Sequence, residues 1–300
     1  MRLVYFLPAS VSSATAQNLM SALGSNGNLS TLSSLISTDS ELLQTVESVD
    51  NITILAPTNK AIEDFEEGNS ARLRDGRLTQ ALMQYHVLNG RYPFDSMRET
   101  GMFIPTLLTD DAHVNVSGGQ VVQAVRTSSH SQNASKISED KVEFYSGYNS
   151  KSTLVDPDIG FDGGLIHTID SMLVIPRNVT ETSLAAGLTS LVGAVRVAEF
   201  QWNEWRNATY FAPNNEAFRA VSSVLANMTK EELHTTLMYH VINDTLPIYT
   251  RRISHADWIT TTGTNITFTL ASDGTIYVNS AAIIRPNVLV ANGVLHVIDK

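Results

Sequence analysis

The spacing of hydrophobic and polar positions changes along this 300-residue chain. In the second half, apolar residues recur at helical spacing: Leu184, Leu188, Leu191, Val192 and Val195. Residues 29–36 show the same pattern in the first half, whereas residues 266–270 alternate strictly and lead into the turn Asp273-Gly274. The first pattern predicts amphipathic helices and the second a β-hairpin. Because helices come first and hairpin strands follow, we expect an α+β fold.

Local signals mark where elements begin. Thr38-x-x-Glu41 and Thr229-x-x-Glu232 are capping boxes, in which side chains satisfy the first N–H groups of a helix. The second box predicts a helix that runs into Tyr239-His240. Asp162-Gly163 and Asn292-Gly293 predict tight turns before the apolar segments LIHTI and VLHVI.

Three motifs occur twice, in the same order. Residues 51–65 (NITILAPTNKAIEDF) match 207–221 (NATYFAPNNEAFRAV), 84–94 (QYHVLNGRYPF) match 238–248 (MYHVINDTLPI), and 163–172 (GGLIHTIDSM) match 292–300 (NGVLHVIDK). The separations are 156, 154 and 129 residues. A unit of this length is longer than a solenoid repeat, so the sequence predicts a complete domain in tandem.

The shorter third separation predicts a 25-residue insertion in the first copy. The polar, Ser- and Asn-rich segment Thr127–Thr153 predicts a surface loop there. We expect a signal peptide over 1–16, a first domain over 17–177 and a second over 179–300, joined by a short linker that limits independent motion. The second copy stops at Lys300, where the first continues, so we expect a domain cut short at its C-terminal strand and a natural chain that runs on toward a lipid anchor.

Composition narrows the function. The net charge is −10 and no basic run occurs, which argues against nucleic acids and anionic membranes as partners. The chain has no cysteine, so thiol nucleophiles, cysteine zinc sites and iron–sulfur clusters are excluded. H-E-x-x-H, G-x-S-x-G and P-loop motifs are absent. We therefore expect no enzyme activity, no cofactor and no metal.

Two features predict secretion. Arg2, the apolar segment Leu3–Leu7 and the small residues Ala14-Thr15-Ala16 have the order of a secretory signal. Nine N-x-S/T sequons predict N-glycosylation: Asn28, Asn51, Asn115, Asn133, Asn178, Asn207, Asn227, Asn243 and Asn265.

The repeated motifs together resemble the fasciclin-type domain. That family carries a T-x-F-A-P-[TN]-[ND]-x-A-F phrase, a central Tyr-His and a closing G-x-[IL]-H-x-I-D, and both copies here match over nearly all of residues 25–300. Leu55 and Ile62 replace the usual aromatics of the first copy. The resemblance implies a wedge or sandwich of β-strands with flanking helices. It also implies a secreted or cell-surface adhesion protein of fungal type, and it relates the Tyr-His region to binding in animal members.

Four kinds of residue are candidates for chemistry. The strand–helix phrase has a folding role at every position, and Asn59 and Asn215 lie where we expect a helix N-cap. Tyr85-His86 and Tyr239-His240 are candidate binding residues, although a histidine that docks the following loop is the simpler interpretation. Trp202 and Trp205 lie in the second copy only, as a candidate binding pair or as caps of the core. His167-x-x-Asp170 and His296-x-x-Asp299 lie on strands, where i and i+3 face opposite ways, so they do not predict a metal site.

The sequence thus predicts a non-enzymatic adhesion module for cell-surface proteins, matrix proteins or cell-wall glycans. The alternative is a carrier that holds a small hydrophobic ligand in a cleft between sheet and helices.

Overall fold

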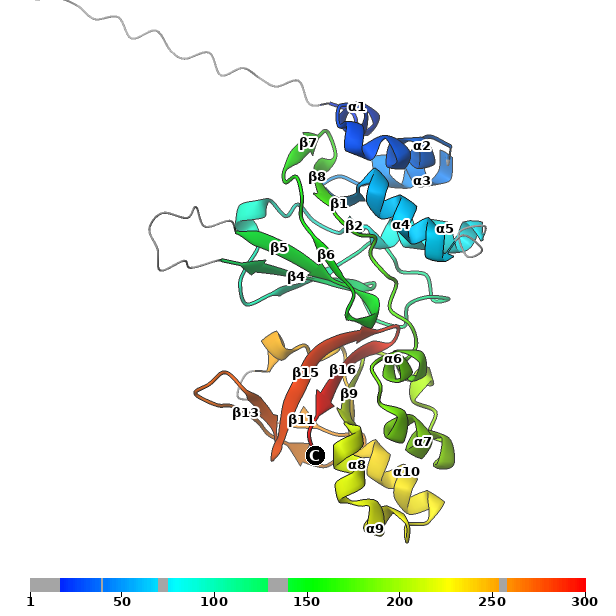
Figure 1. Cartoon of the computed structure of the whole chain (residues 1–300), viewed down its shortest axis with the longest axis vertical. Helices are drawn as coiled ribbons and strands as arrows, with labels where there is room; N and C mark the ends of the chain where they lie inside the picture. Colours follow the sequence, from blue (N-terminus) through cyan, green and yellow to red (C-terminus); the bar gives the residue numbers. More distant parts are fainter. Residues whose placement is uncertain (1–16, 39, 70–74, 129–139, 254–257) are drawn as a thin grey trace, which may run out of the picture.

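The computed structural model describes residues 17–38, 40–69, 75–128, 140–253 and 258–300. Figure 1 shows two α+β units along the long axis, with helices along one side of each unit and sheets along the other. The α+β fold class predicted from the sequence is confirmed. The predicted signal peptide, residues 1–16, and the sequon at Asn133 lie outside the described residues.

The first unit holds two four-stranded sheets, β2-β1-β8-β7 and β3-β4-β5-β6. Its elements are α1 (Leu19–Gly24), η1 (Gly27–Leu29), α2 (Ser30–Thr38), α3 (Ser40–Glu47), β1 (Ile52–Pro57), α4 (Asn59–Asn69), α5 (Gly76–Tyr85), β2 (Val87–Leu88), η2 (Phe94–Ser96), β3 (Met102–Pro105), β4 (Val121–Thr127), β5 (Lys141–Tyr145), η3 (Gly147–Asn149), β6 (Lys151–Thr153), β7 (Ile159–Phe161) and β8 (Gly164–Ile169).

The second unit holds a six-stranded sheet, β10-β9-β16-β15-β14-β13, and the two-stranded β11-β12. Its elements are α6 (Val179–Ala185), α7 (Thr189–Val197), η4 (Trp202–Glu204), β9 (Ala208–Pro213), α8 (Asn215–Ala220), α9 (Ser222–Leu225), α10 (Lys230–Met238), β10 (Val241–Asn243), η5 (Thr250–Arg252), β11 (Trp258–Ile259), β12 (Asn265–Ile266), β13 (Phe268–Leu270), β14 (Ile276–Val278), β15 (Ala281–Val290) and β16 (Gly293–Ile298).

The repeated strand–helix phrase forms the centre of each unit. In the first unit, β1 pairs in parallel with β8, the strand of the closing motif, and β9 pairs with β16 in the same way. All four strands are buried along their whole length. This explains why their sequences are apolar runs instead of alternating patterns. The first and third motifs are thus neighbours in space although they lie far apart in the chain.

The helix that follows each central strand is capped one residue earlier than the sequence indicates. We expected Asn59 and Asn215 as caps, but Thr58 Oγ1 accepts from Ala61 N and Asn214 Oδ1 accepts from Ala217 N. Asn59 and Asn215 bind the backbone of the preceding helices instead: Asn59 Oδ1 accepts from Thr31 N, and Asn215 Oδ1 accepts from Ser190 N. Each asparagine therefore ties the corner to the helical layer.

Two predictions about local structure are wrong. The segment Thr127–Thr153 is not all loop, because β5 and β6 lie inside it and pair with β4 and with each other. Val142 and Phe144 are fully buried and alternate with polar neighbours, a period-two signal that the Ser- and Asn-rich composition hid. The apolar pattern over 184–195 is not one helix either. Gly187, with φ of +77°, ends α6, and α7 begins at Thr189.

Helix α10 begins as predicted. Thr229 and Glu232 form both hydrogen bonds of the capping box, and the helix ends at Met238 with Tyr239 as its C-cap. The other predicted box spans Asp39, which lies outside the described residues.

Candidate functional site at the junction of the two domains

The two units meet through a set of backbone and amide hydrogen bonds. Asn115 N donates to Ala291 O at 2.7 Å, and Gln120 Nε2 donates to Val290 O at 3.2 Å. Asn207 bonds Ser117 in both directions: its Oδ1 accepts from Ser117 N at 2.7 Å and its Nδ2 donates to Ser117 Oγ at 2.9 Å. Because these bonds need defined geometry at several points, they fix the orientation of one unit on the other.

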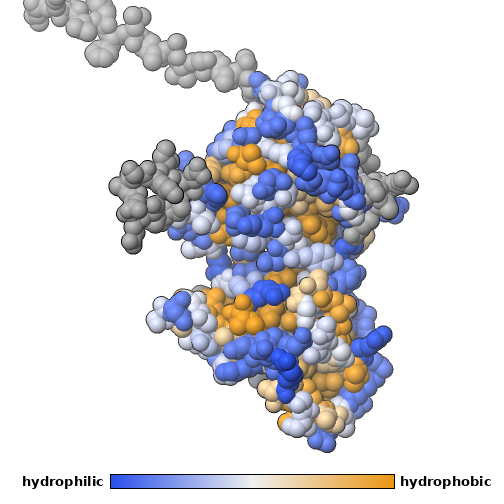
Figure 2. Space-filling view, in the orientation of Figure 1, coloured by the Kyte–Doolittle hydropathy of each residue, from blue (hydrophilic) through white to orange (hydrophobic). Residues whose placement is uncertain are grey.

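Apolar contacts complete the junction. The rings of Phe103 and Tyr249 stack at 4.0 Å between centroids, and Val121 of the first unit joins Leu289 and Val294 of the second in one buried cluster. Figure 2 shows apolar surface gathered at the waist of the molecule, on the lower unit where it faces the upper one. The junction therefore combines directional hydrogen bonds with a small hydrophobic core of its own.

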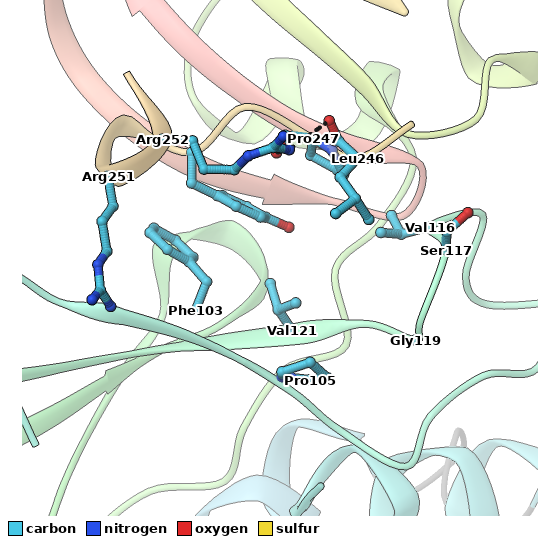
Figure 3. A pocket seen from close by; sticks show the side chains of 11 residues that line it. Phe103, Pro105, Val116, Ser117, Gly119, Val121, Leu246, Pro247, Arg251 and Arg252 are labelled. Atoms are coloured by element: carbon cyan, nitrogen blue, oxygen red, sulfur yellow. Dashed lines mark hydrogen bonds between the residues drawn. The ribbon is translucent and has the colours of Figure 1, made fainter. Parts of the chain in front are cut away.

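A cavity of about 360 Å³ opens between the units beside this stack. We call it the junction cleft; it is lined by Phe103, Pro105, Val116, Ser117, Gly119, Val121, Leu246, Pro247, Tyr249, Arg251 and Arg252. Figure 3 shows Phe103, Pro105 and Val121 on one wall, and Leu246 and Pro247 on the opposite one. Its size is within the range of small-molecule sites.

Tyr249 is the unusual member of the cleft. The residue is 7% exposed, and among the described residues its hydroxyl has no hydrogen-bond partner. Burial raises the pKa of its phenol, so the group is neutral and keeps its proton. A buried polar atom without a partner costs free energy, and such atoms are rare in folded proteins.

A second, polar cavity of about 300 Å³ lies on another side of the junction. Its walls include Asp111, His113, Glu181 and Asn203, with Asn292 also lining it. Asn292 Oδ1 is buried and has no partner among the residues that the structure describes, while Nδ2 donates to Trp202 O, Trp205 O and the Tyr210 hydroxyl.

The two predicted Tyr-His pairs have different surroundings. Tyr85 is fully buried, and its hydroxyl donates to Val121 O at 2.9 Å, directly beneath the junction. His86 is also buried; Nδ1 donates to Leu82 O and Nε2 accepts from Leu173 N. Because both side chains are buried, this pair offers little surface to a binding partner. A contribution of this pair to binding would be indirect, through the junction near Val121 or through the segment around Leu173.

The second pair is more open. Tyr239 is 46% exposed, and His240 is half-buried with Nδ1 bonded to Thr236 O at 2.8 Å. Burial lowers the pKa of both His86, to about 4, and His240. Both imidazoles are therefore neutral at pH 7. The predicted binding role of this pair stays a prediction.

The predicted tryptophan pair is not an exposed platform. Trp202 is 3% exposed, donates from Nε1 to Thr180 Oγ1, and meets Tyr210 edge to face at 6.1 Å. Trp205 is half-buried against Phe200. The two rings fill the space between η4 and the core of the second unit. This packing corresponds to the alternative given above, in which the tryptophans cap the core.

The closing-motif histidines brace each unit in the same way. His167 Nδ1 accepts from Asp158 N and Nε2 donates to Tyr92 O, while His296 accepts from Asn287 N and donates to Ile248 O. Burial lowers the pKa of both rings, that of His296 to about 4. Both nitrogens are used by the backbone, so these residues tie loops to the central strand.

The predicted sequons divide by exposure. Five asparagines are exposed: Asn28, Asn51, Asn227, Asn243 and Asn265. The other three described ones lie around the junction. Asn207 is 7% exposed, Asn115 Nδ2 donates to Trp205 O, and Asn178 caps α6 by accepting from Glu181 N. The first five side chains are open to solvent, whereas the other three are partly or fully buried and take part in hydrogen bonds around the junction or at a helix cap.

The sequence matches the Fasciclin domain family over residues 27–176 and 186–300. The chain belongs to the fasciclin domain family. The predicted resemblance is thereby confirmed. A "Fasciclin-like arabinogalactan protein" of Arthroderma benhamiae is 32% identical over all of this chain and 70% of its own length. The "Fasciclin-like arabinogalactan protein elcF" of Phaeosphaeria nodorum is 30% identical over 98% of this chain and 90% of its own.

Among solved structures, a FAS1 domain pair of the insect cell adhesion molecule Fasciclin I aligns with a TM-score of 0.42 and 19% identity. The alignment covers 92% of this chain and 96% of the insect one. Because the family model matches the chain in two separate regions, the two units described above are two fasciclin domains, and the junction is a contact between tandem copies. Among the described residues, none of the helices has the length and apolarity needed to cross a bilayer.

Proposed function

We propose that this chain is a secreted or cell-surface glycoprotein that acts as a non-enzymatic adhesion module on matrix proteins, surface proteins or cell-wall glycans. Two things support the proposal: the fungal relatives are fasciclin-like arabinogalactan proteins, and the two fasciclin domains are held in one orientation. The junction is the observation that carries the mechanism. Two weak sites on one rigid unit gain avidity, because binding at the first site raises the effective concentration of the second.

The test compares two asparagines at the same position of the repeat. Asn207→Ala removes the paired bonds to Ser117 and loosens the junction, whereas Asn51→Ala removes an exposed side chain at the equivalent corner. Both substitutions remove a sequon, but we expect a glycan at Asn51 and none at Asn207, so a loss of binding in Asn207→Ala would not come from a lost glycan. Glycosylated protein is titrated onto immobilised cell-wall polysaccharide and onto cell-surface protein extracts. We expect Asn207→Ala to weaken binding at least about tenfold and Asn51→Ala to leave it unchanged. Equal binding by all three proteins would remove the avidity mechanism, and no binding by any would remove the adhesion function.

Glycan mapping tests the surface glycoprotein proposal separately. We expect glycans at the five exposed sequons and none at Asn115, Asn178 or Asn207, whose amide groups serve the junction or a helix cap. Glycopeptide mass spectrometry of secreted protein measures occupancy at each site, and N-terminal sequencing tests cleavage before Gln17. A fully occupied Asn207 in protein with an intact junction would contradict the assignment.

The carrier alternative is favoured by one observation in the second domain. A hollow of about 250 Å³, lined mainly by apolar side chains, lies between α8, α9, α10 and the end of β9. Val224 of α9 lines this hollow and is 55% exposed; Val197 of α7 is 63% exposed and does not line it. If the hollow carries a ligand, Val224→Asp should abolish binding of an apolar fluorescent probe, and Val197→Asp should not. Loss of probe binding in both variants, or in neither, would count against this second function.

A further inference from the structure

The junction cleft has the composition of a site for an amphiphilic anion. Its walls are apolar, and among the described residues that line it the only charged ones are Arg251 and Arg252. An apolar cavity with cationic groups at one side matches a ligand that has a hydrocarbon body and an acidic head.

The two arginines have different geometry. Figure 3 shows Arg251 extending away from the cavity toward the first domain, where its Nη1 donates to Gly101 O at 3.4 Å. Arg252 extends along the second-domain side of the cavity, and its Nη1 donates to Leu246 O and Pro247 O at 3.3 Å each. Arg251 thus braces the two domains on either side of the cleft. Arg252 places a guanidinium, with five N–H donors in all, beside the cavity.

The hydroxyl of Tyr249 supplies the second, independent observation. It belongs to a residue that lines the cavity, is nine-tenths buried, and has no partner among the described residues. Removing an orphaned hydroxyl normally stabilises a protein, so retaining it in a buried stack has a cost in the ligand-free state. A hydroxyl that keeps its proton can donate to a carboxylate oxygen, and the nearby guanidinium favours the same charge.

We propose that the junction cleft binds an amphiphilic carboxylate, with the aliphatic chain against Phe103, Val116, Val121 and Leu246 and the carboxylate between the Tyr249 hydroxyl and the Arg252 guanidinium. The ligand would touch both fasciclin domains at once. Because the ligand binds only when the two domains are in this arrangement, its binding would also stabilise the junction. This site is independent of the proposed adhesion function and of the hollow beside α9.

Isothermal titration calorimetry with decanoate, decan-1-ol and decylamine tests the charge and chain requirements on the full chain. We expect decanoate to bind with one site per chain, and decan-1-ol and decylamine at least tenfold more weakly. Arg252→Gln should weaken decanoate at least tenfold. Arg285→Gln removes the same charge from β15, does not line the cleft, and should leave the affinity within twofold. Equal affinity for decylamine, or an unchanged affinity in Arg252→Gln, would overturn the proposal.

Tyr249→Phe gives a readout that a merely structural role would not produce. The variant keeps the stacked ring and loses only the orphaned hydroxyl, so the ligand-free protein should melt at the same or a higher temperature. Its affinity for decanoate should nevertheless fall about fivefold to tenfold. A lower melting temperature without any loss of affinity would show that the hydroxyl serves the fold. If Val224→Asp abolished decanoate binding and Tyr249→Phe did not, the ligand would belong to the α9 hollow and the assignment to the cleft would be wrong.

Discussion

The two Tyr-His pairs begin from the same backbone and end in different environments. Each lies at the C-terminal end of a helix, α5 or α10. Each histidine carbonyl accepts from the central strand at 2.8 Å: His86 O from Leu55 N and His240 O from Phe211 N. In both, Nδ1 bonds the carbonyl four residues earlier. Up to this point the repeated motif determines the structure.

The neighbours in space then separate the pairs. In the first domain, the segment Met172–Ile175 covers the imidazole, and Leu173 N donates to His86 Nε2 at 2.9 Å. In the second, His240 borders the hollow beside α9, and Tyr239 is 46% exposed. The comparison shows that a two-residue motif specifies a helix end and a strand contact, while the packing around it decides whether the same side chains are core or surface.

Acid should separate the pairs most strongly. The pKa of His86 is about 4, below the ordinary 6.5, because burial disfavours the charged ring and a proton on Nε2 would face the Leu173 N–H. The unfolded chain therefore binds more protons between these values, and stability falls as the pH drops from about 6.5 to about 4. For His86 alone the full loss is about 3 kcal/mol.

Urea unfolding of the wild type and His86→Gln at pH 7 and pH 4.5 measures this contribution. His86→Gln should lose less stability on acidification than the wild type, by most of that amount. His240→Gln is the matched control: burial lowers the pKa of His240 as well, but its ring is only half-buried, so we expect the acid-induced loss of this variant to stay closer to that of the wild type. If an NMR titration gave the same pKa for the imidazoles of His86 and His240, the comparison between the two pairs would fail.

Deleting the two rings should give the next largest difference. His86→Ala leaves the Leu173 N–H buried without an acceptor and opens a cavity, so we expect a loss of about 2–3 kcal/mol at pH 7. His240→Ala removes a half-buried ring next to an existing hollow and should cost about 1 kcal/mol or less. Chemical denaturation measures both losses. Amide hydrogen exchange at Leu173 shows whether the loss in the first variant is local, and equal losses in the two domains would contradict the comparison.

The repeat made most of the fold predictable from the sequence. Thr229 and Glu232 cap their helix as the pattern indicates, because the capping box is a local signal. The parallel pairing of β1 with β8 was not predicted, since it joins segments more than 100 residues apart in the sequence, and both strands are mostly apolar and buried along their whole length, without an alternating pattern. Gly187 was overlooked within a helical period, and the alternation at Val142 and Phe144 was hidden by polar composition.

The junction could be predicted least. Asn115 and Asn207 both begin sequons, and nothing in N-x-S/T distinguishes an exposed acceptor from an asparagine that bonds a neighbouring domain. The same holds for Tyr249, which follows only three apolar residues and precedes Thr-Arg-Arg, a context that does not indicate a buried contact between domains. Which residues lie at a contact between domains depends on how the two folded domains pack together, and the local periodicity of the sequence does not indicate this. The Tyr-His pairs were found from the sequence because they repeat, whereas their different burial needed the structure.

The smallest expected effect concerns the two tyrosine hydroxyls. Tyr85→Phe removes the donor to Val121 O and leaves that buried carbonyl without this bond, so we expect a loss of about 1 kcal/mol. Tyr239→Phe changes an exposed hydroxyl and should stay within about 0.5 kcal/mol of the wild type. Urea denaturation measures both. Because Val121 also lies in the junction cluster, Tyr85→Phe should raise hydrogen exchange at the backbone of β4 as well. If Tyr239→Phe lost more stability than Tyr85→Phe, Tyr239 would have a structural role that its exposure does not indicate. The distinction between a buried pair in the first domain and an exposed pair in the second would then fail.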